Sequence, residues 1–196
     1  MRSTTVPVPA LLALLLLIAL PAAARAQGQP ESPPASPPEA SSAAARRAAT
    51  EARFAAGFAR LQFLRGRWTG PAAQGASRAA AVPLEFRPVL GGKYLEAEGM
   101  MLQVEARLTV SYDTVEDRYR MTILDAGSGV LDVYAGAFDA AGALVLTNPH
   151  FFRVSLIPHE DGTWTWRGEH SPDEGRTWGV NATYHMTRVP AGARDR

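Results

Sequence analysis

The sequence predicts a mainly β protein, a single antiparallel up-and-down β-barrel of about nine to ten strands with one N-terminal amphipathic helix. Two observations carry this prediction: short runs of alternating polar and apolar residues recur about every 10–14 residues, and turn signals separate them. A meander with this many strands in one sheet must curl or close. Closure also removes the exposed edges that invite aggregation, so we expect a closed barrel.

The strand runs begin near Trp68 and continue to the end of the folded part. A clear example is "VEARLTVSYD" (Val104 to Asp113), which the turn "TVED" separates from "RYRMTILDA". The stretches "LGG", "GSG", "HEDG" and "SPDEGR" supply further turns, rich in the glycine, aspartate and proline that tight turns require. No long helical period survives in this region. We assign residues 66–190 to the barrel and residues 191–196 to a tail.

The N-terminal segment has the features of a cleaved signal peptide. Arg2 precedes the apolar run "ALLALLLLIAL", and Ala24-Arg25-Ala26 forms an A-x-A cleavage pattern. That run is too short for a lasting membrane anchor, and no later stretch reaches the ~18 apolar residues that a membrane helix needs. We therefore expect residues 1–26 to be removed near Ala26. The product should be soluble and exported to the periplasm or secreted, without a stable membrane span.

Two segments separate the signal peptide from the barrel. Residues 27–41 are dominated by proline, serine and alanine, which predicts a disordered linker. Residues 42–65 are rich in helix formers, and Phe54, Phe58 and Leu61 recur at helical spacing. We expect one amphipathic helix that packs against the barrel and that Gly66 ends.

Composition excludes several classes of function. The chain contains no cysteine, which excludes disulfides, thiolate metal sites, iron–sulfur clusters and cysteine nucleophiles. Without residues 1–26 the chain carries 18 basic and 19 acidic side chains, a net charge of −1, and the charges are interspersed. A nucleic-acid interface needs clustered basic residues, so we expect no nucleic-acid partner.

Three motifs, taken in order, resemble those of known barrel families. The stretch "FLRGRWTG" (Phe63 to Gly70) is similar to the G-x-W start of calycin barrels, which include lipocalins, fatty-acid-binding proteins and nitrobindin-like proteins. Together with "VLGGKYLEAEG" and "SYDTVEDRYRM", it resembles most closely an uncharacterised bacterial exported family of lipocalin-like barrels. The resemblance covers roughly residues 61–189 and implies a fold, not a chemistry. It also implies that Gly66 and Trp68 form a structural plug at one end of the barrel.

Strand alternation selects the candidate ligand-binding residues of the lumen. Acidic residues that share a strand face with large apolar neighbours can point into a cavity, where burial would raise the pKa of a carboxyl group. The alternative is a surface face on which the glutamates pair with arginines of neighbouring strands, such as Arg107, Arg118 or Arg120. The aromatic residues could line a cavity or fill a core. The candidates are Tyr94, Glu96, Glu98, Asp132, Tyr134, Trp164, Trp166 and His170.

Histidines and arginines define the remaining options. The resemblance to nitrobindin-like barrels makes haem a candidate cofactor, held by His170 or His185. Alternation places His170 with Trp164 and Trp166, facing inward, and His185 outside. An inward arginine would suit a carboxylate ligand; alternation leaves Arg153 ambiguous and places Arg167 outside. No short metal-ligand spacing and no serine-nucleophile motif is present, so we expect no metal site and no catalytic residues.

These observations favour a non-catalytic exported barrel that binds a small apolar or amphipathic ligand in its lumen. One alternative is a filled barrel that acts as a structural or protein-interaction module. Another is a haem protein or an enzyme, because a fold alone does not exclude either. The sequence does not name a ligand, and it does not fix the oligomeric state.

Overall fold

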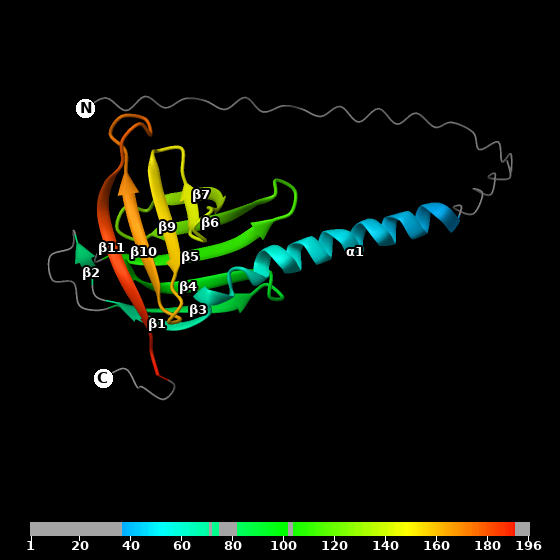
Figure 1. Cartoon of the computed structure of the whole chain (residues 1–196), viewed down its shortest axis with the longest axis horizontal. Coiled ribbons are helices and arrows are strands. Elements are labelled where there is room, and N and C mark those ends of the chain that lie inside the picture. The colour runs from blue at the N-terminus through cyan, green and yellow to red at the C-terminus, as the bar shows by residue number, and fades with distance from the viewer. Residues whose placement is uncertain (1–36, 71, 75–81, 102–103, 191–196) are drawn as a thin grey trace, which may run out of the picture. The chain divides into compact units, whose positions relative to one another are not determined.

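The computed structural model describes residues 37–70, 72–74, 82–101 and 104–190, and leaves the side chains of residues 37–41, 72–74, 82 and 100–101 undescribed. The expected signal peptide, residues 27–36 of the expected linker and the expected tail lie outside the described residues. Eleven strands are present in the described part of the chain, and ten of them close into the expected antiparallel barrel (Figure 1).

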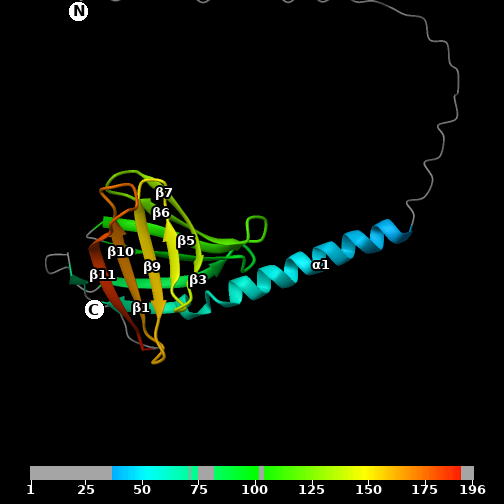
Figure 2. The same cartoon turned by 45° about the horizontal axis from the view of Figure 1, so that its top comes forward.

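Each barrel strand pairs with the next one along the chain, and β1 closes the cylinder by pairing with β11. Trp68 of β1 lies opposite Arg188 of β11 at this closure. The short β2 also pairs with β11, beyond the stretch that β1 covers. Figures 1 and 2 both show β9, β10 and β11 side by side in one wall. The strands are β1 (Gly66–Gly70), β2 (Ala72–Gln74), β3 (Val82–Val89), β4 (Tyr94–Met101), β5 (Val104–Asp113), β6 (Arg118–Asp125), β7 (Leu131–Phe138), β8 (Leu144–Thr147), β9 (Phe152–Pro158), β10 (Trp164–His170) and β11 (Gly179–Arg188).

Alternation along the strands separates the core from the outer surface. On β5, Ala106, Leu108 and Val110 are buried, whereas Glu105 and Arg107 between them are exposed. β6, β8 and the second half of β11 show the same alternation, whereas β9 and the end of β10 have consecutive buried residues. Burial of these apolar side chains is the main stabilising contribution to a chain without disulfides.

The helix α1 (Pro37–Ala59) begins earlier and ends earlier than the sequence predicted. Five residues assigned to the linker belong to it, and a short 3₁₀ turn, η1 (Gln62–Leu64), follows it. The C-terminal part of α1 contacts the barrel closely. The Tyr119 hydroxyl donates to the Gly57 carbonyl at 2.9 Å, and a Cβ at Gly57 would overlap the Tyr112 ring. Among the described residues, no helix is both long enough and apolar enough to span a membrane.

The barrel has two different ends. We call the end that contains η1 and Trp68 the closed end. The hairpin between β6 and β7 and the turn between β8 and β9 (residues 148–151) lie at the opposite end, which we call the open end.

Candidate functional site

The closed end is filled by aromatic side chains. Trp68 is fully buried, and its ring meets that of Trp164 edge to face with centroids 6.0 Å apart. Trp164 also packs edge to face against Phe63 and Phe86. Its Nε1 is buried without a hydrogen-bond partner among the described residues. Among the described residues, these rings therefore fill this half of the lumen.

Gly66 and Trp68 take the positions that a plug requires. The Trp68 Nε1 donates to the Leu64 carbonyl at 2.6 Å, and the Arg188 guanidinium lies over the indole at 4.5 Å. Gly66 has a φ of +116°, and a Cβ there would lie 2.6 Å from Arg188 Nη1. Any other residue would adopt a strained backbone conformation at this turn, and the end of the Arg188 side chain would have to move. The contacts with Leu64 and Arg188 thus hold the Trp68 indole at the closed end of the barrel.

A cavity of about 250 Å³ lies at the open end. Strands β5, β6, β7, β9, β10 and β11 all contribute to its wall. Most of the lining is apolar, which suits the nonpolar part of a small molecule. The main apolar residues are Val104, Ala106, Ile123, Phe152, Val154 and Trp166.

Polar groups gather where β6, β7 and β11 reach this cavity. Asp132 and Tyr134 lie on the same face of β7, and the Asn148 amide donates to Asp132 Oδ1 at 3.1 Å. Asn148 also accepts hydrogen bonds from the amides of His150 and Phe152, which holds the turn at residues 148–151 in place. Tyr134 is only 5% exposed, and its hydroxyl makes no hydrogen bond with the described residues. Burial, together with the negative charge of Asp132, raises the pKa of Tyr134, so this hydroxyl stays protonated.

A buried ion pair borders the cavity on β9 and β10. Glu169 is 3% exposed and lies opposite Arg153 in the ladder, with Arg153 Nε 2.7 Å from Oε2. Arg167 Nη2 lies 3.0 Å from the other carboxylate oxygen, and the Arg153 guanidinium stacks over Trp178. The hydrogen bond from Arg153 is the main reason that the pKa of Glu169 falls below its usual value. Arg153 is thus committed to Glu169, and a carboxylate ligand would have to compete with that partner.

Three of the eight predicted lumen residues meet at this cavity, namely Asp132, Tyr134 and Trp166. Trp164 also faces inward, but it belongs to the packed closed end and does not line the cavity. One residue, Thr165, separates Trp164 from Trp166 on β10, so the floor of the cavity lies between the two indoles.

The prediction that Tyr94, Glu96 and Glu98 face the lumen was wrong. The buried residues of β4 are Leu95 and Ala97, which places the other three on the outer face. There Glu98 pairs with Arg107 across the β4–β5 ladder, and Glu96 Oε1 lies 3.3 Å from Arg87 Nη2. This is the surface arrangement that the sequence left open as the alternative. Ionised groups remain hydrated there, so the outer face is the favoured position.

His170 does not reach the cavity, although its alternation was read correctly. The β9–β10 register continues to the pair His170 and Phe152, so His170 shares the face of Gly168. It is the last residue of β10, however, and its exposed ring lies against the Phe152 ring at the rim.

His185, as expected, lies on the outer face, next to Thr165 and His159. The described residues therefore offer a haem no axial histidine inside the cavity, and they do not fit that cofactor. No group of three or more metal-binding side chains comes together in the described part of the chain.

Sequence reasoning missed several cavity residues, and Asn181 is the most informative. The ladder pairs Gly168 with Ala182 but Glu169 with Val180, so Asn181 is an extra residue in β11. Such a bulge turns two consecutive side chains to one side. Asn181 Oδ1 lies 2.8 Å from the position a Cβ on Gly168 would take, next to the cavity. Alternation alone assigns Asn181 to the outer face. Asp125, by contrast, shares its strand face with Ile123, so alternation could have identified its inward position.

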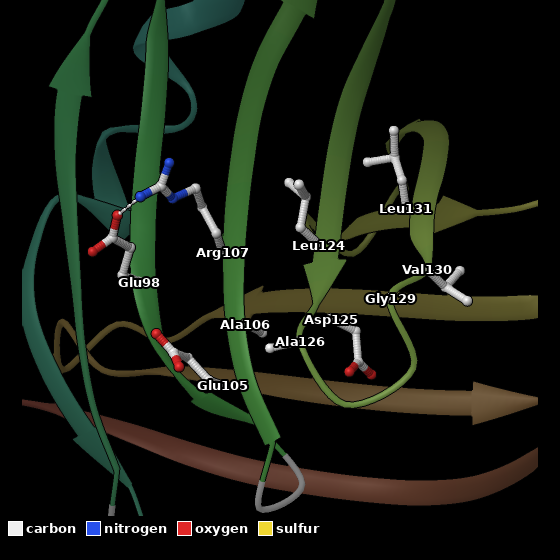
Figure 3. Close-up of a pocket in the computed structure, with 10 residues that line it drawn as sticks. All are labelled: Glu98, Glu105, Ala106, Arg107, Leu124, Asp125, Ala126, Gly129, Val130 and Leu131. Atoms are coloured by element: carbon white, nitrogen blue, oxygen red, sulfur yellow. Dashed lines mark hydrogen bonds and ion pairs between the residues drawn. The ribbon is translucent and has the colours of Figure 1, made fainter.

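A second concave region lies on the outer face of β4 to β7. Figure 3 shows this outer groove, which has a volume of about 390 Å³, with the Glu98–Arg107 ion pair on one side. The side chains of Leu124 and Leu131 come from neighbouring strands and are 44% and 59% exposed. The outer groove is therefore a partly apolar surface on the barrel wall and not an enclosed site.

No family model and no curated protein matches this chain. The closed antiparallel barrel with one helix is compatible with a lipocalin-like fold. The cavity at its open end defines the class of site as a small, mostly apolar pocket with a few polar groups.

Proposed function

We propose that the barrel is a non-catalytic binding protein that holds a small amphipathic molecule in the cavity at its open end. The observation that carries this proposal is the combination of an apolar wall with the convergent polar groups of Asp132, Tyr134 and Asn181. Because aromatic rings fill the closed end, a ligand would reach the cavity from the open end.

The volume limits the size of the ligand. A dry cavity of about 150 Å³ holds one benzene molecule. By proportion, a cavity of about 250 Å³ takes a ligand of about ten non-hydrogen atoms. Sites for drug-sized molecules occupy about 300–1,000 Å³, so a long-chain lipid or a haem would need a larger space.

The finer assignments belong to the same proposal. The order of the "FLRGRWTG", "VLGGKYLEAEG" and "SYDTVEDRYRM" motifs supports membership of the uncharacterised exported family of lipocalin-like barrels. The A-x-A pattern at Ala26 supports export, with action in the periplasm or outside the cell.

The experiment is a binding titration with 2-phenylethanol, a neutral amphipathic molecule of suitable size. Trp166 lines the cavity, so its fluorescence should change as the ligand binds. Native mass spectrometry of the purified protein should show a single ligand bound.

A cavity-filling variant makes the titration specific. Ala182 is buried in the cavity wall, so Ala182→Phe should fill the cavity and abolish binding. Ala137 is exposed on β7, and Ala137→Phe should leave binding unchanged. Wild-type protein that shows no saturable binding, or equal binding by both variants, would refute the proposal.

The outer groove supports a second candidate, a protein-interaction module. Leu124 and Leu131 are exposed neighbours, and together they give the outer groove a continuous apolar surface. If Ala182→Phe binds 2-phenylethanol normally and Leu131→Asp does not, the outer groove and not the cavity binds this small molecule.

A further inference from the structure

We infer that the ligand of the open-end cavity carries a protonated amine, which the carboxylate of Asp132 binds. This inference rests on the proposed function, because it concerns the charge of the molecule that the cavity holds. It adds a chemical class to a site that is otherwise defined by size and apolarity.

The charges around the cavity are unequal. Arg153 is the one basic residue among those that line it, and Asp125, Asp132 and Glu169 are acidic. Glu169 already neutralises Arg153 and also pairs with Arg167. This leaves two carboxylates, on Asp125 and Asp132, without a basic partner among the described residues.

The two carboxylates differ in the hydrogen bonds that they accept. Asp125 Oδ1 accepts hydrogen bonds from the amides of Gly127 and Ser128 at 2.7 and 3.1 Å, so it stabilises the hairpin between β6 and β7. Asp132 accepts one hydrogen bond, from Asn148 through Oδ1, and no other hydrogen bond to it comes from the described residues. A half-buried carboxylate with few partners gains most from a cation that enters the cavity.

Tyr134 provides a second, independent sign of a polar ligand group. Its side chain is more than nine-tenths buried and lines the cavity, yet its hydroxyl has no hydrogen-bond partner among the described residues. The hydroxyl oxygen is not fully enclosed by protein, so it is accessible from the cavity to a ligand group. Tyr134 lies two residues from Asp132 on the same face of β7, and both side chains line the cavity, so both offer an acceptor to an ammonium group that enters it.

The rest of the lining suits an amine with an apolar body. Phe152 and Trp166 border the same cavity and offer aromatic surface to a ring or a cation. A carboxylate ligand would instead be repelled by the carboxylates of Asp125 and Asp132. Its expected partner, Arg153, already forms an ion pair with Glu169. The cavity therefore favours a small arylalkylamine or alkylamine over a fatty acid of the same size.

The test uses three probes of nearly equal size: 2-phenylethylamine, 2-phenylethanol and phenylacetate. Their affinities for the purified protein are measured by titration calorimetry at pH 7 in buffers of low and physiological ionic strength. We expect the amine to bind at least tenfold more tightly than the alcohol, and the carboxylate to bind most weakly. The advantage of the amine should decrease as salt increases, because salt screens the attraction between charges.

Variants assign the effect to Asp132. Asp132→Asn keeps the shape and an acceptor for Asn148, so it should remove the advantage of the amine and leave the affinity for the alcohol unchanged. Tyr134→Phe should also weaken the affinity for the amine, but by a smaller factor than Asp132→Asn. Glu105→Gln removes an exposed carboxylate of the outer groove and should change nothing. Thermal unfolding of each variant identifies any that fails to fold.

The outcomes separate this inference from the proposed function. If the amine and the alcohol bind equally, or if Asp132→Asn keeps the amine preference, the inference is wrong while the cavity remains a binding site. If none of the three probes binds to wild-type protein, the proposed function fails and the inference fails with it. If phenylacetate binds most tightly, Arg153 and not Asp132 governs recognition, and the inference is overturned.

Discussion

The closed end and the open end of this barrel are formed by the same antiparallel strands, but they differ in how the lumen is filled. At the closed end, the rings of Trp68 and Trp164 fill the lumen, and the Trp68 indole is hydrogen-bonded to the backbone. At the open end, the Tyr134 hydroxyl has no partner among the described residues, β11 carries a bulge, and a cavity remains. The difference shows that aromatic rings pack the closed end, while polar groups border an open space at the other end. Substitutions at the two ends should therefore separate stability from binding.

The largest effect is expected from Trp68→Ala at the closed end. Removal of this fully buried indole should lower the free energy of unfolding by about 3–5 kcal/mol, because a cavity replaces a well-packed ring. Chemical denaturation measures the loss. Trp68→Phe should recover part of it, since a smaller ring still meets Trp164. A Trp68→Ala protein as stable as wild type would show that the closed end does not carry the packing energy.

An intermediate loss of stability is expected from Glu169→Gln, which removes the buried carboxylate beside the open end. The variant should lose about 1.5–3 kcal/mol at pH 7, because two charge-assisted hydrogen bonds are weakened.

The pH dependence of this loss has a definite sign. The pKa of Glu169 is lowered in the folded protein, so its contribution is fully present above pH 4.5, the usual pKa of a glutamate. The contribution is lost as the pH falls through the folded-state pKa. The gap in stability between wild type and variant should therefore shrink on acidification. Glu105→Gln, at an exposed position, serves as the control, and a gap that stays constant down to low pH would contradict the assignment.

These two ends also show how far the sequence could predict the molecule. Closure of the barrel, the position of Trp68 and the bounds of β5 follow from alternation, turn residues and the G-x-W motif. The face of β4 could not be decided in this way, because Tyr94 and Leu95 give both of its faces an apolar residue. The partners Arg87 and Arg107 on the neighbouring strands settle it, and such pairing depends on the register between strands.

The open end was harder to predict than the closed end for a physical reason. Alternation identified Asp132, Tyr134 and Trp166, but it does not say where the wall of the barrel stops, so His170 was placed too deep. A bulge shifts alternation by one residue and leaves no mark in composition, which explains why Asn181 was assigned to the outer face. The Arg153–Glu169 pair was missed because it depends on the register between β9 and β10.

A smaller effect on stability is expected from Tyr134→Phe at the open end. The hydroxyl has no partner among the described residues, so its removal should leave stability unchanged or raise it by up to about 1 kcal/mol. Thermal denaturation measures this change. The same variant should bind the amine probe more weakly, which would place the hydroxyl among the groups kept for binding. A clear loss of stability would instead show that Tyr134 is needed for packing.

The smallest effect is expected on the outer face, from Glu98→Gln. The ion pair between Glu98 and Arg107 is about half exposed on both sides, and such pairs contribute about 0–1 kcal/mol. Because Glu98 borders the outer groove and not the cavity, the variant should bind 2-phenylethanol and 2-phenylethylamine as wild type does. Stability measured at low and high salt should converge, since salt screens an exposed pair. A change in ligand affinity at this position would move the site from the open end to the outer groove, because the wall of β4 and β5 separates Glu98 from the lumen.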